Sequence, residues 1–220
     1  KIIKTAKLMG IESTLPKNLT IALGTGEVTP IELANSYATL ASGGIYAPPI
    51  EIRKVLDNNG LTIEENRLEP TVAINPATAY VVSHMMTSVV KHGTAVRAKS
   101  LGRPLAGKTG TTNRSRNTWF AGFSPDLVAV VWVGFDDNTP TRRLTGSSAA
   151  LPIWIQFMQQ ALDGLPFSDF SAPEEIALRR IDKRTGEITN NENYFEEVFL
   201  PGTEPSEQTT ELPSIFLKDY

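Results

Sequence analysis

The residue types best suited to chemistry gather in one short stretch of the chain, Lys-Thr-Gly-Thr-Thr-Asn from Lys108 to Asn113. The ammonium group of Lys108 and the neighbouring hydroxyls can hold a carboxylate through charge-assisted hydrogen bonds. Gly110 leaves room for a bulky ligand to lie against the backbone, and the N–H and C=O groups of an exposed strand can bind an extended peptide. The stretch therefore predicts a strand that binds the terminal carboxylate of a peptide.

The same region also matches a phosphate-binding loop, because residues 102–109 read Gly-Arg-Pro-Leu-Ala-Gly-Lys-Thr. Such a loop needs a buried strand before it and a helix after it, so that backbone N–H groups point at the phosphates. Residues 95–100 are too polar for that strand, and residues 110–119 contain few good helix formers. A P-loop nucleotide-binding protein is therefore the disfavoured alternative.

The overall composition excludes several other classes of protein. The chain of 220 residues has 21 Lys and Arg against 24 Asp and Glu, a net charge of -3, and no cysteine. This gives no electrostatic basis for binding nucleic acid, and it rules out thiolate metal sites and a cysteine nucleophile. The only histidines, His84 and His92, lie on one predicted helix and its end, so we expect no metal and no other cofactor. No apolar run is long enough to span a bilayer, and we expect this chain by itself to be soluble.

The positive charges are unevenly distributed along the chain. Between Glu69 and Asp126 there is no acidic residue. The cations in that stretch are Lys91, Arg97, Lys99, Arg103, Lys108, Arg114 and Arg116. They form either an ordinary solvated face or a binding site for an anion such as a carboxylate.

The elements expected to position the Lys-Thr-Gly stretch are helices around an antiparallel sheet. Capping residues and apolar periodicity predict helices over residues 1–9, 29–43, 75–93 and 147–162. A peripheral hairpin is predicted over residues 48–64, and a three-stranded meander from strands at 104–112, 118–123 and 127–135. The apolar run of the last strand is typical of burial on both faces. The aromatic residues expected in the core are Trp119, Phe120, Trp132 and Trp154.

The last part of the chain differs in composition from the rest. Beyond Gly164 acidic residues outnumber basic ones, and from Glu196 to Pro213 the sequence is rich in Glu, Thr, Pro and Ser. We therefore predict one domain over residues 1–165, followed by an acidic and partly disordered C-terminal extension over residues 166–220.

Several blocks of the sequence resemble the transpeptidase domain of class A (bifunctional) penicillin-binding proteins, in the order that the family has them, and the details most resemble the 1A type. The blocks are residues 22–37, 41–46, 107–113, 117–125 and 131–136. The resemblance implies an α/β fold of the penicillin-recognising serine transpeptidase and β-lactamase type, an antiparallel sheet flanked by helices, of which this chain holds the C-terminal portion.

The family resemblance also implies an activity and its partners. The activity is acyl transfer in peptidoglycan synthesis: a serine attacks a D-Ala-D-Ala stem peptide, D-Ala leaves, and an amine of another stem resolves the acyl-enzyme. The implied ligands are peptidoglycan stem peptides and β-lactam antibiotics, with no cofactor, metal or nucleic acid. The parent protein is expected at the periplasmic face of a bacterial inner membrane, with an N-terminal anchor and a glycosyltransferase domain outside this chain.

The resemblance assigns roles to the Lys-Thr-Gly stretch. Lys108 and Thr111 are the implied catalytic residues, because the ammonium adds positive potential and the Thr111 N–H is one donor of the oxyanion hole. The hydroxyls of Thr109 and Thr111 are expected to bind the substrate carboxylate. The substrate-binding set is Thr109, Gly110, Thr111, Thr112 and Asn113.

The nucleophile of the family is the serine of a Ser-x-x-Lys motif, which is followed by a Ser-x-Asn motif, and both are expected upstream of this chain. Ser88 with Lys91 matches the first pattern, but at the end of a helix and in the wrong order and spacing. Ser115 with Asn117 matches the second, but falls in the turn after the Lys-Thr-Gly strand, where we expect a polar hairpin connection. We therefore expect this chain to contain no nucleophile, to need the upstream half of the same protein, and to be inactive alone. A third interpretation is a non-catalytic structural fragment that binds partners through its acidic tail.

Overall fold

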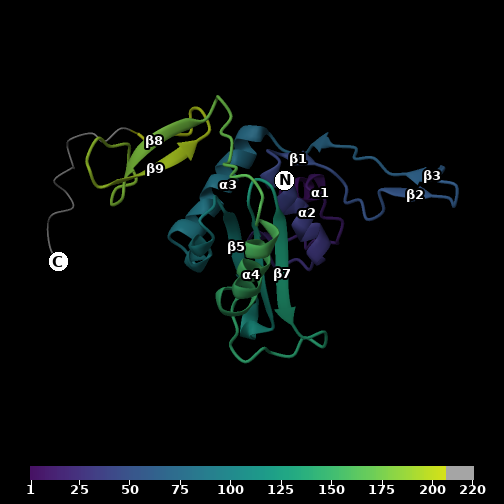
Figure 1. Ribbon diagram of the computed structural model, residues 1–220. Helices are drawn as coiled ribbons and strands as arrows, with labels where there is room; N and C mark the ends of the chain where they lie inside the picture. Colours follow the sequence, from purple (N-terminus) through teal and green to yellow (C-terminus); the bar gives the residue numbers. More distant parts are fainter. Residues whose placement is uncertain (207–220) are drawn as a thin grey trace. The chain divides into compact units, whose positions relative to one another are not determined.

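The structure is a computed structural model that describes residues 1–206. The described residues divide into two compact units, Lys1–Ser171 and residues 172–206 (Figure 1). The Lys-Thr-Gly stretch lies in the first unit, whose centre is a sheet with helices packed on it.

The central sheet is the predicted antiparallel meander. Its strands are β5 (Ala106–Thr111), β6 (Asn117–Phe123) and β7 (Val128–Gly134), in the order β5-β6-β7. The short helix η3 (Asn113–Ser115) joins β5 to β6. Lys108 pairs with Ala121 and Thr111 with Thr118 across the ladder. The Lys-Thr-Gly stretch therefore lies on an edge strand of the described sheet.

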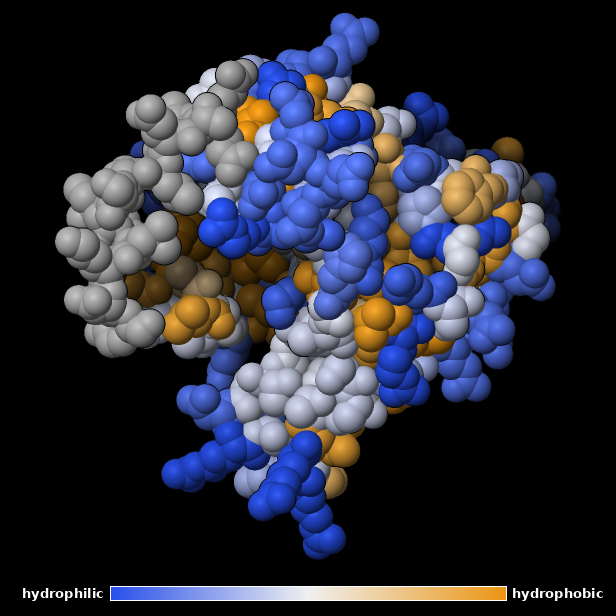
Figure 2. Space-filling view, turned by 90° about the vertical axis from the view of Figure 1, so that its left-hand side faces the viewer, coloured by the Kyte–Doolittle hydropathy of each residue, from blue (hydrophilic) through white to orange (hydrophobic). Residues whose placement is uncertain are grey.

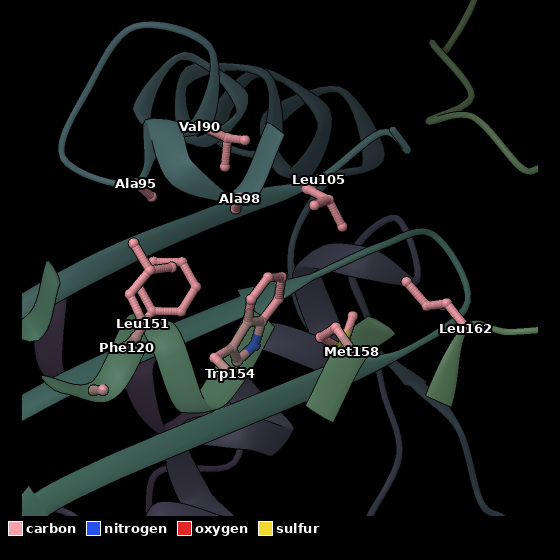
Figure 3. Close-up of a cluster of buried hydrophobic side chains, with 10 residues drawn as sticks. Val90, Ala95, Ala98, Leu105, Phe120, Leu151, Trp154, Met158 and Leu162 are labelled. Carbon is pink, nitrogen blue, oxygen red and sulfur yellow. The ribbon is translucent and has the colours of Figure 1, made fainter. Parts of the chain in front are cut away.

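One face of the sheet carries the larger apolar cluster, which Figure 3 shows in close-up. Helix α4 (Leu151–Ala161) covers this face, together with the end of α3 (Pro76–Lys91) and the short helix η2 (Val96–Leu101). Phe120 of β6 meets Trp154 of α4 edge to face, with ring centroids 4.9 Å apart. Both side chains are completely buried, as the sequence predicts for them, and the Trp154 indole N–H donates to the Ala129 carbonyl at 3.0 Å.

The opposite face packs against α2 (Pro30–Ala41) and the beginning of α3. Leu40, Ala79, Ala106 and Phe123 form its buried cluster, and the Tyr37 ring lies edge-on to Phe123 at 6.1 Å. Phe120 and Phe123 belong to different clusters because side chains an odd number of positions apart on a strand point to opposite faces. The sheet is thus covered by helices on both faces.

The helices α2 and α3 begin at the capping residues that the sequence predicts. Thr29 and Glu32 form a reciprocal capping box at the start of α2, and the Asn75 side chain accepts the N–H groups of Ala77 and Thr78 at the start of α3. The first helix is α1 (Ile2–Leu8). The predicted last helix begins differently, because a π turn, η4 (Gly146–Ala150), precedes α4.

The smaller elements lie outside the central sheet. A short helix, η1 (Leu19–Leu23), precedes α2, and β1 (Ile45–Tyr46) pairs with β4 (Thr71–Val72). Between them the predicted hairpin, β2 (Lys54–Leu56) and β3 (Thr62–Glu65), extends away from the sheet (Figure 1).

The second unit contains an antiparallel hairpin of β8 (Ala177–Asp182) and β9 (Tyr194–Phe199). The Arg180 guanidinium lies 4.6 Å from the centre of the Tyr194 ring. Glu196–Phe199 belong to β9, although the composition predicts poor order from Glu196 onward. Residues 207–213 of that predicted stretch lie outside the described residues.

Two burial predictions are wrong. Every residue of β7 is partly exposed, because within the described residues β7 has a hydrogen-bonded neighbour on one side only. Trp119 and Trp132, which were expected in the core, are also only partly buried; they pair across β6 and β7 with ring centroids 6.2 Å apart. The apolar sequence of β7 thus predicted more burial than this strand has in the structure.

The Glu32 carboxylate joins the start of α2 to the segment after α1. It accepts the backbone N–H groups of Thr29 at 2.7 Å, Ser13 at 2.6 Å and Glu12 at 2.8 Å, and the hydroxyls of Ser13 and Thr29. These hydrogen bonds lower the pKa of Glu32 to about 2, and the largest contribution comes from the backbone N–H of Thr29, followed by Ser13.

We expect Glu32→Gln to lower the free energy of unfolding by about 2 kcal/mol at pH 7, because the amide cannot replace the ionised carboxylate in these hydrogen bonds. Solvent screening of this partly exposed group keeps the effect below the full value of the pKa shift. A folded pKa below the unfolded value stabilises the fold above about pH 4.5, and this stabilisation disappears as the pH falls towards 2. Urea unfolding of both proteins from pH 7 to pH 2 tests this, with exposed Glu27→Gln as the control. A constant difference between Glu32→Gln and the unmodified chain at all pH values would contradict it.

Candidate substrate-binding strand

Strand β5 positions Lys108, Thr109 and Thr111 along one edge of the sheet. Ala106 belongs to the cluster under α2, so alternation places Lys108 on that face and Thr109 and Thr111 on the face that carries Phe120 and α4. The Lys108 ammonium nevertheless donates to the carbonyl of Thr109 at 2.9 Å. The Lys108 side chain therefore lies against the backbone of β5 at Thr109 and is exposed to solvent.

The ladder also determines where the backbone of Thr111 points. The N–H of Thr112 donates to the carbonyl of Asn117 at 3.0 Å, towards β6. Because successive residues of an antiparallel strand direct their N–H and C=O groups to alternate sides, those of Thr111 and Thr109 point away from β6. The described sheet has no strand on that side of β5. The outer edge therefore presents donors and acceptors that an extended peptide can pair with.

The hydroxyl of Thr111 has a defined orientation. Its oxygen accepts the backbone N–H of Gly146 at 3.1 Å, and Thr111 is exposed. A hydroxyl carries one proton to donate in addition to its acceptor lone pairs, so this contact leaves the O–H of Thr111 available for a carboxylate. The Thr109 hydroxyl lies 2.9 Å from that of Thr94, in the segment after α3.

Gly146 is a site residue that sequence reasoning missed. A Cβ atom at this position would lie 2.4 Å from the carbonyl oxygen of Trp119 and 2.9 Å from that of Gly110. Both are backbone atoms that cannot move aside, so glycine is required for the start of η4 to approach β5 and hold Thr111. The available signal was a glycine directly before the predicted start of the helix at Ser147.

The remaining predicted residues have mainly local contacts. The Thr112 hydroxyl accepts the N–H of Asn117 at 2.9 Å and so supports the turn, and Asn113 lies exposed in η3. The Asn117 side chain accepts the indole N–H of Trp132 at 2.9 Å. Ser115 therefore lies in the connection between β5 and β6, as the sequence analysis predicts, and Asn117 is the first residue of β6.

Ser88 is half-buried near the end of α3, and Lys91 is the last residue of that helix. Among the contacts of residues 1–206, no hydrogen bond joins the Ser88 hydroxyl to Lys91 or Lys108.

The phosphate-loop alternative is wrong. Residues 102–105 lead from the short helix η2 directly into β5, and Lys108 and Thr109 lie within the strand itself. The strand continues into a hairpin with β6 rather than into a helix. The backbone N–H groups of this segment are thus arranged in a ladder and cannot encircle a phosphate.

Residues 1–206 contain no cluster of three or more His, Asp or Glu side chains suited to binding a metal ion. None of the helices in that range is long and apolar enough to cross a membrane.

Comparison with known proteins relates this strand to one family. The penicillin binding protein transpeptidase domain matches residues 10–159. Penicillin-binding protein 1A of Aquifex aeolicus (strain VF5) is 36% identical over 216 residues, which are 97% of this chain and 30% of that protein. The chain thus spans less than a third of the length of this relative.

Two solved structures share the fold. The crystal structure of penicillin-binding protein 1A from Haemophilus influenzae has a TM-score of 0.83 and 28% identity, and covers 92% of this chain and 36% of its own. The PonA1 protein from Mycobacterium tuberculosis in complex with penicillin V has a TM-score of 0.69 and 28% identity, with coverages of 79% and 52%. The family match includes all of β5, β6 and β7, and the chain therefore belongs to the penicillin-binding protein transpeptidase family.

Proposed function

We propose that this chain provides the substrate-binding strand of a serine D,D-transpeptidase that cross-links peptidoglycan stem peptides. The observation that carries the proposal is the outer edge of β5, which has no neighbouring strand in the described sheet and on which the exposed residues Lys108 and Thr111 lie three positions apart. Family membership supports it, because the matched domain is a transpeptidase.

In this proposal, each group has a distinct task on the peptide. Lys108 and the hydroxyls of Thr109 and Thr111 hold the terminal carboxylate of a D-Ala-D-Ala peptide, which pairs with β5 in an extended conformation. Thr111 N–H donates to the carbonyl oxygen of the scissile bond as that oxygen becomes negative. The peptide passes over Gly110 of β5 and then beside Thr112 and Asn113 at the start of the turn.

The reaction needs a serine from sequence outside these 220 residues, and we propose that the upstream half of the same protein supplies it. The serine oxygen bonds to the carbonyl carbon, the C–N bond breaks, and D-Ala leaves after its nitrogen takes up a proton. The amine of a second stem then attacks the ester carbon, forms the cross-link and releases the serine. No cofactor or metal enters these steps.

The same serine is proposed to react with β-lactams, and the structure of the similar PonA1 protein has been solved in complex with penicillin V. The relatives named 1A are longer than this chain. We propose that the parent protein acts at the periplasmic face of the inner membrane, with its anchor and a glycosyltransferase domain in the additional sequence.

A product assay tests the proposed function. The full-length protein should release D-Ala from a synthetic peptide ending in D-Ala-D-Ala, and prior incubation with penicillin should abolish the release. ATP with magnesium should leave the melting temperature unchanged, whereas a nucleotide at about 100 times its dissociation constant would add about 2.7 kcal/mol of stability. If correctly folded full-length protein releases no D-Ala from this peptide, the proposal is refuted.

A further inference from the structure

Two loops meet at the end of the sheet where β5 turns into β6. The first contains residues 112–116, and the second contains residues 135–145, which lead from β7 to η4. Thr141 joins them, because its N–H donates to the Ser115 carbonyl at 2.9 Å and its hydroxyl donates to the same oxygen. The Arg116 guanidinium donates to the carbonyl of Asn138 at 3.0 Å. We call these two connected segments the loop pair.

The backbone of the loop pair is unusual within the described residues. All five non-glycine residues with positive φ in residues 1–206 lie in it, namely Arg114, Ser115, Asn138, Arg142 and Arg143, at φ values from 50° to 74°. This conformation is costly for residues other than glycine and collects at functional sites. Three of the five are arginines, which are not the residues that tolerate it best. The local backbone therefore does not explain why arginines occupy these positions.

The loop pair carries more positive than negative charge. It contains Arg114, Arg116, Arg142 and Arg143 against Asp136 and Asp137. The guanidinium groups of Arg114, Arg142 and Arg143 are exposed, and in the described part of the chain neither an ion pair nor a hydrogen bond engages them. The loop that follows β7 lies at the lower end of the central sheet in Figure 1, and hydrophilic side chains project from the lower end in Figure 2.

The proposed binding mode directs a peptide towards these arginines. In that mode the terminal carboxylate lies at Lys108 and the hydroxyls of Thr109 and Thr111, and the scissile carbonyl, one residue earlier in the peptide, lies at the Thr111 N–H. The rest of the peptide therefore continues past Thr111 towards residues 112–116. An extended chain advances about 3.3 Å per residue, so the residues two to four positions before the terminal carboxylate reach the loop pair.

We propose that the loop pair binds a second carboxylate of the substrate, carried by the peptide two to four residues before its C-terminus. A guanidinium group holds a carboxylate by two parallel hydrogen bonds, and three exposed arginines on two joined loops can converge on one acidic side chain. This inference rests on the proposed function and adds to it a preference for acidic peptides. The proposal thereby gives the cationic stretch between Glu69 and Asp126 a ligand of opposite charge.

The test compares two peptides ending in D-Ala-D-Ala that differ at one position, three residues before the C-terminus, where one has a carboxylate and the other the neutral amide. Full-length protein should release D-Ala from the acidic peptide with a kcat/KM about five- to tenfold higher. In the double variant Arg114→Gln/Arg143→Gln this ratio should fall to about one. Arg67→Gln, whose partner is Glu65 on the β2–β3 hairpin, is the matched control and should keep the preference.

A charge reversal provides an independent measurement. The charge-reversal variant Arg114→Glu/Arg143→Glu, which leaves Arg142 as the one arginine of the three, should favour a peptide with a lysine at the varied position over the acidic one, and raising the salt concentration should weaken both preferences. Equal kcat/KM values for acidic and amide peptides in the unmodified protein would overturn this inference and leave the proposed function standing. Failure to release D-Ala from either peptide would overturn both. Loss of binding to anionic phospholipid vesicles in the double variant, with an unchanged peptide preference, would assign the arginines to a membrane and overturn it as well.

Discussion

After incubation with a fluorescent penicillin, the isolated 220-residue chain is expected to show no covalent label on a denaturing gel. Acylation needs a serine whose oxygen is activated by a neighbouring base and lies next to the oxyanion donor. The only Ser-x-x-Lys match is Ser88 with Lys91, on a helix that precedes β5, and no contact of the described residues joins the Ser88 hydroxyl to Lys91. Under the proposed function, this chain contributes the carboxylate-binding strand and the reacting serine comes from sequence outside these 220 residues.

The full-length protein is the positive control for this experiment and should be labelled under the same conditions. Ser88→Ala distinguishes the two possible sources of a label. In the full-length protein this variant should be labelled as strongly as the unmodified protein. A band on the isolated chain that Ser88→Ala abolishes would show that α3 supplies the nucleophile, and the roles proposed for β5 would then need another geometry.

The second large effect is expected at Thr111 in the full-length protein. If its O–H donates to the substrate carboxylate, Thr111→Ala should lose about 1.5–3 kcal/mol, roughly tenfold to more than a hundredfold in the rate of acylation. Thr111→Val, which nearly keeps the shape, should behave like Ala, and Thr111→Ser should retain most of the activity. The outward N–H of residue 111 survives all three changes, so some acylation should remain.

A β-lactam with its carboxylate either free or esterified separates the two possible roles of Thr111. The second-order acylation constant of Thr111→Ala should be low with the free acid and close to that of the unmodified protein with the ester. The hydroxyl also accepts the Gly146 N–H, so a purely structural role is a real alternative. Equal defects with acid and ester would mean that Thr111 positions the strand and does not bind the carboxylate.

Gly146 gives a structural control for the same strand. Adding a methyl group there forces the start of η4 away from the backbone of Trp119 and Gly110. Gly146→Ala should therefore reduce acylation of the free acid and of the ester alike, and should lower the free energy of unfolding by about 1–3 kcal/mol. Urea unfolding with the two acylation assays checks both. A variant of normal stability and activity would contradict the tight contact.

Much of the architecture follows from local sequence patterns. The helices after Thr29 and Asn75 begin at their predicted caps, because a side chain that satisfies the first free N–H groups acts within one turn of chain. The meander of β5, β6 and β7 follows from three predicted strands separated by short turns, which can only pair antiparallel. The sequence therefore predicts the Lys-Thr-Gly motif on a strand, beside the turn.

Other features depend on contacts between residues far apart in the chain. Thr111 meets Gly146, and Ser115 meets Thr141, across separations of 35 and 26 positions. The sequence alone could not show that Arg142 and Arg143 join Arg114 at the end of the sheet, because the pairing depends on how β7 returns to η4. Nor could it show that β7 is half-exposed, since apolar content reports what a strand can bury and not what covers it. Local capping and periodicity were sufficient for the elements, whereas the site required the tertiary structure that brings their ends together.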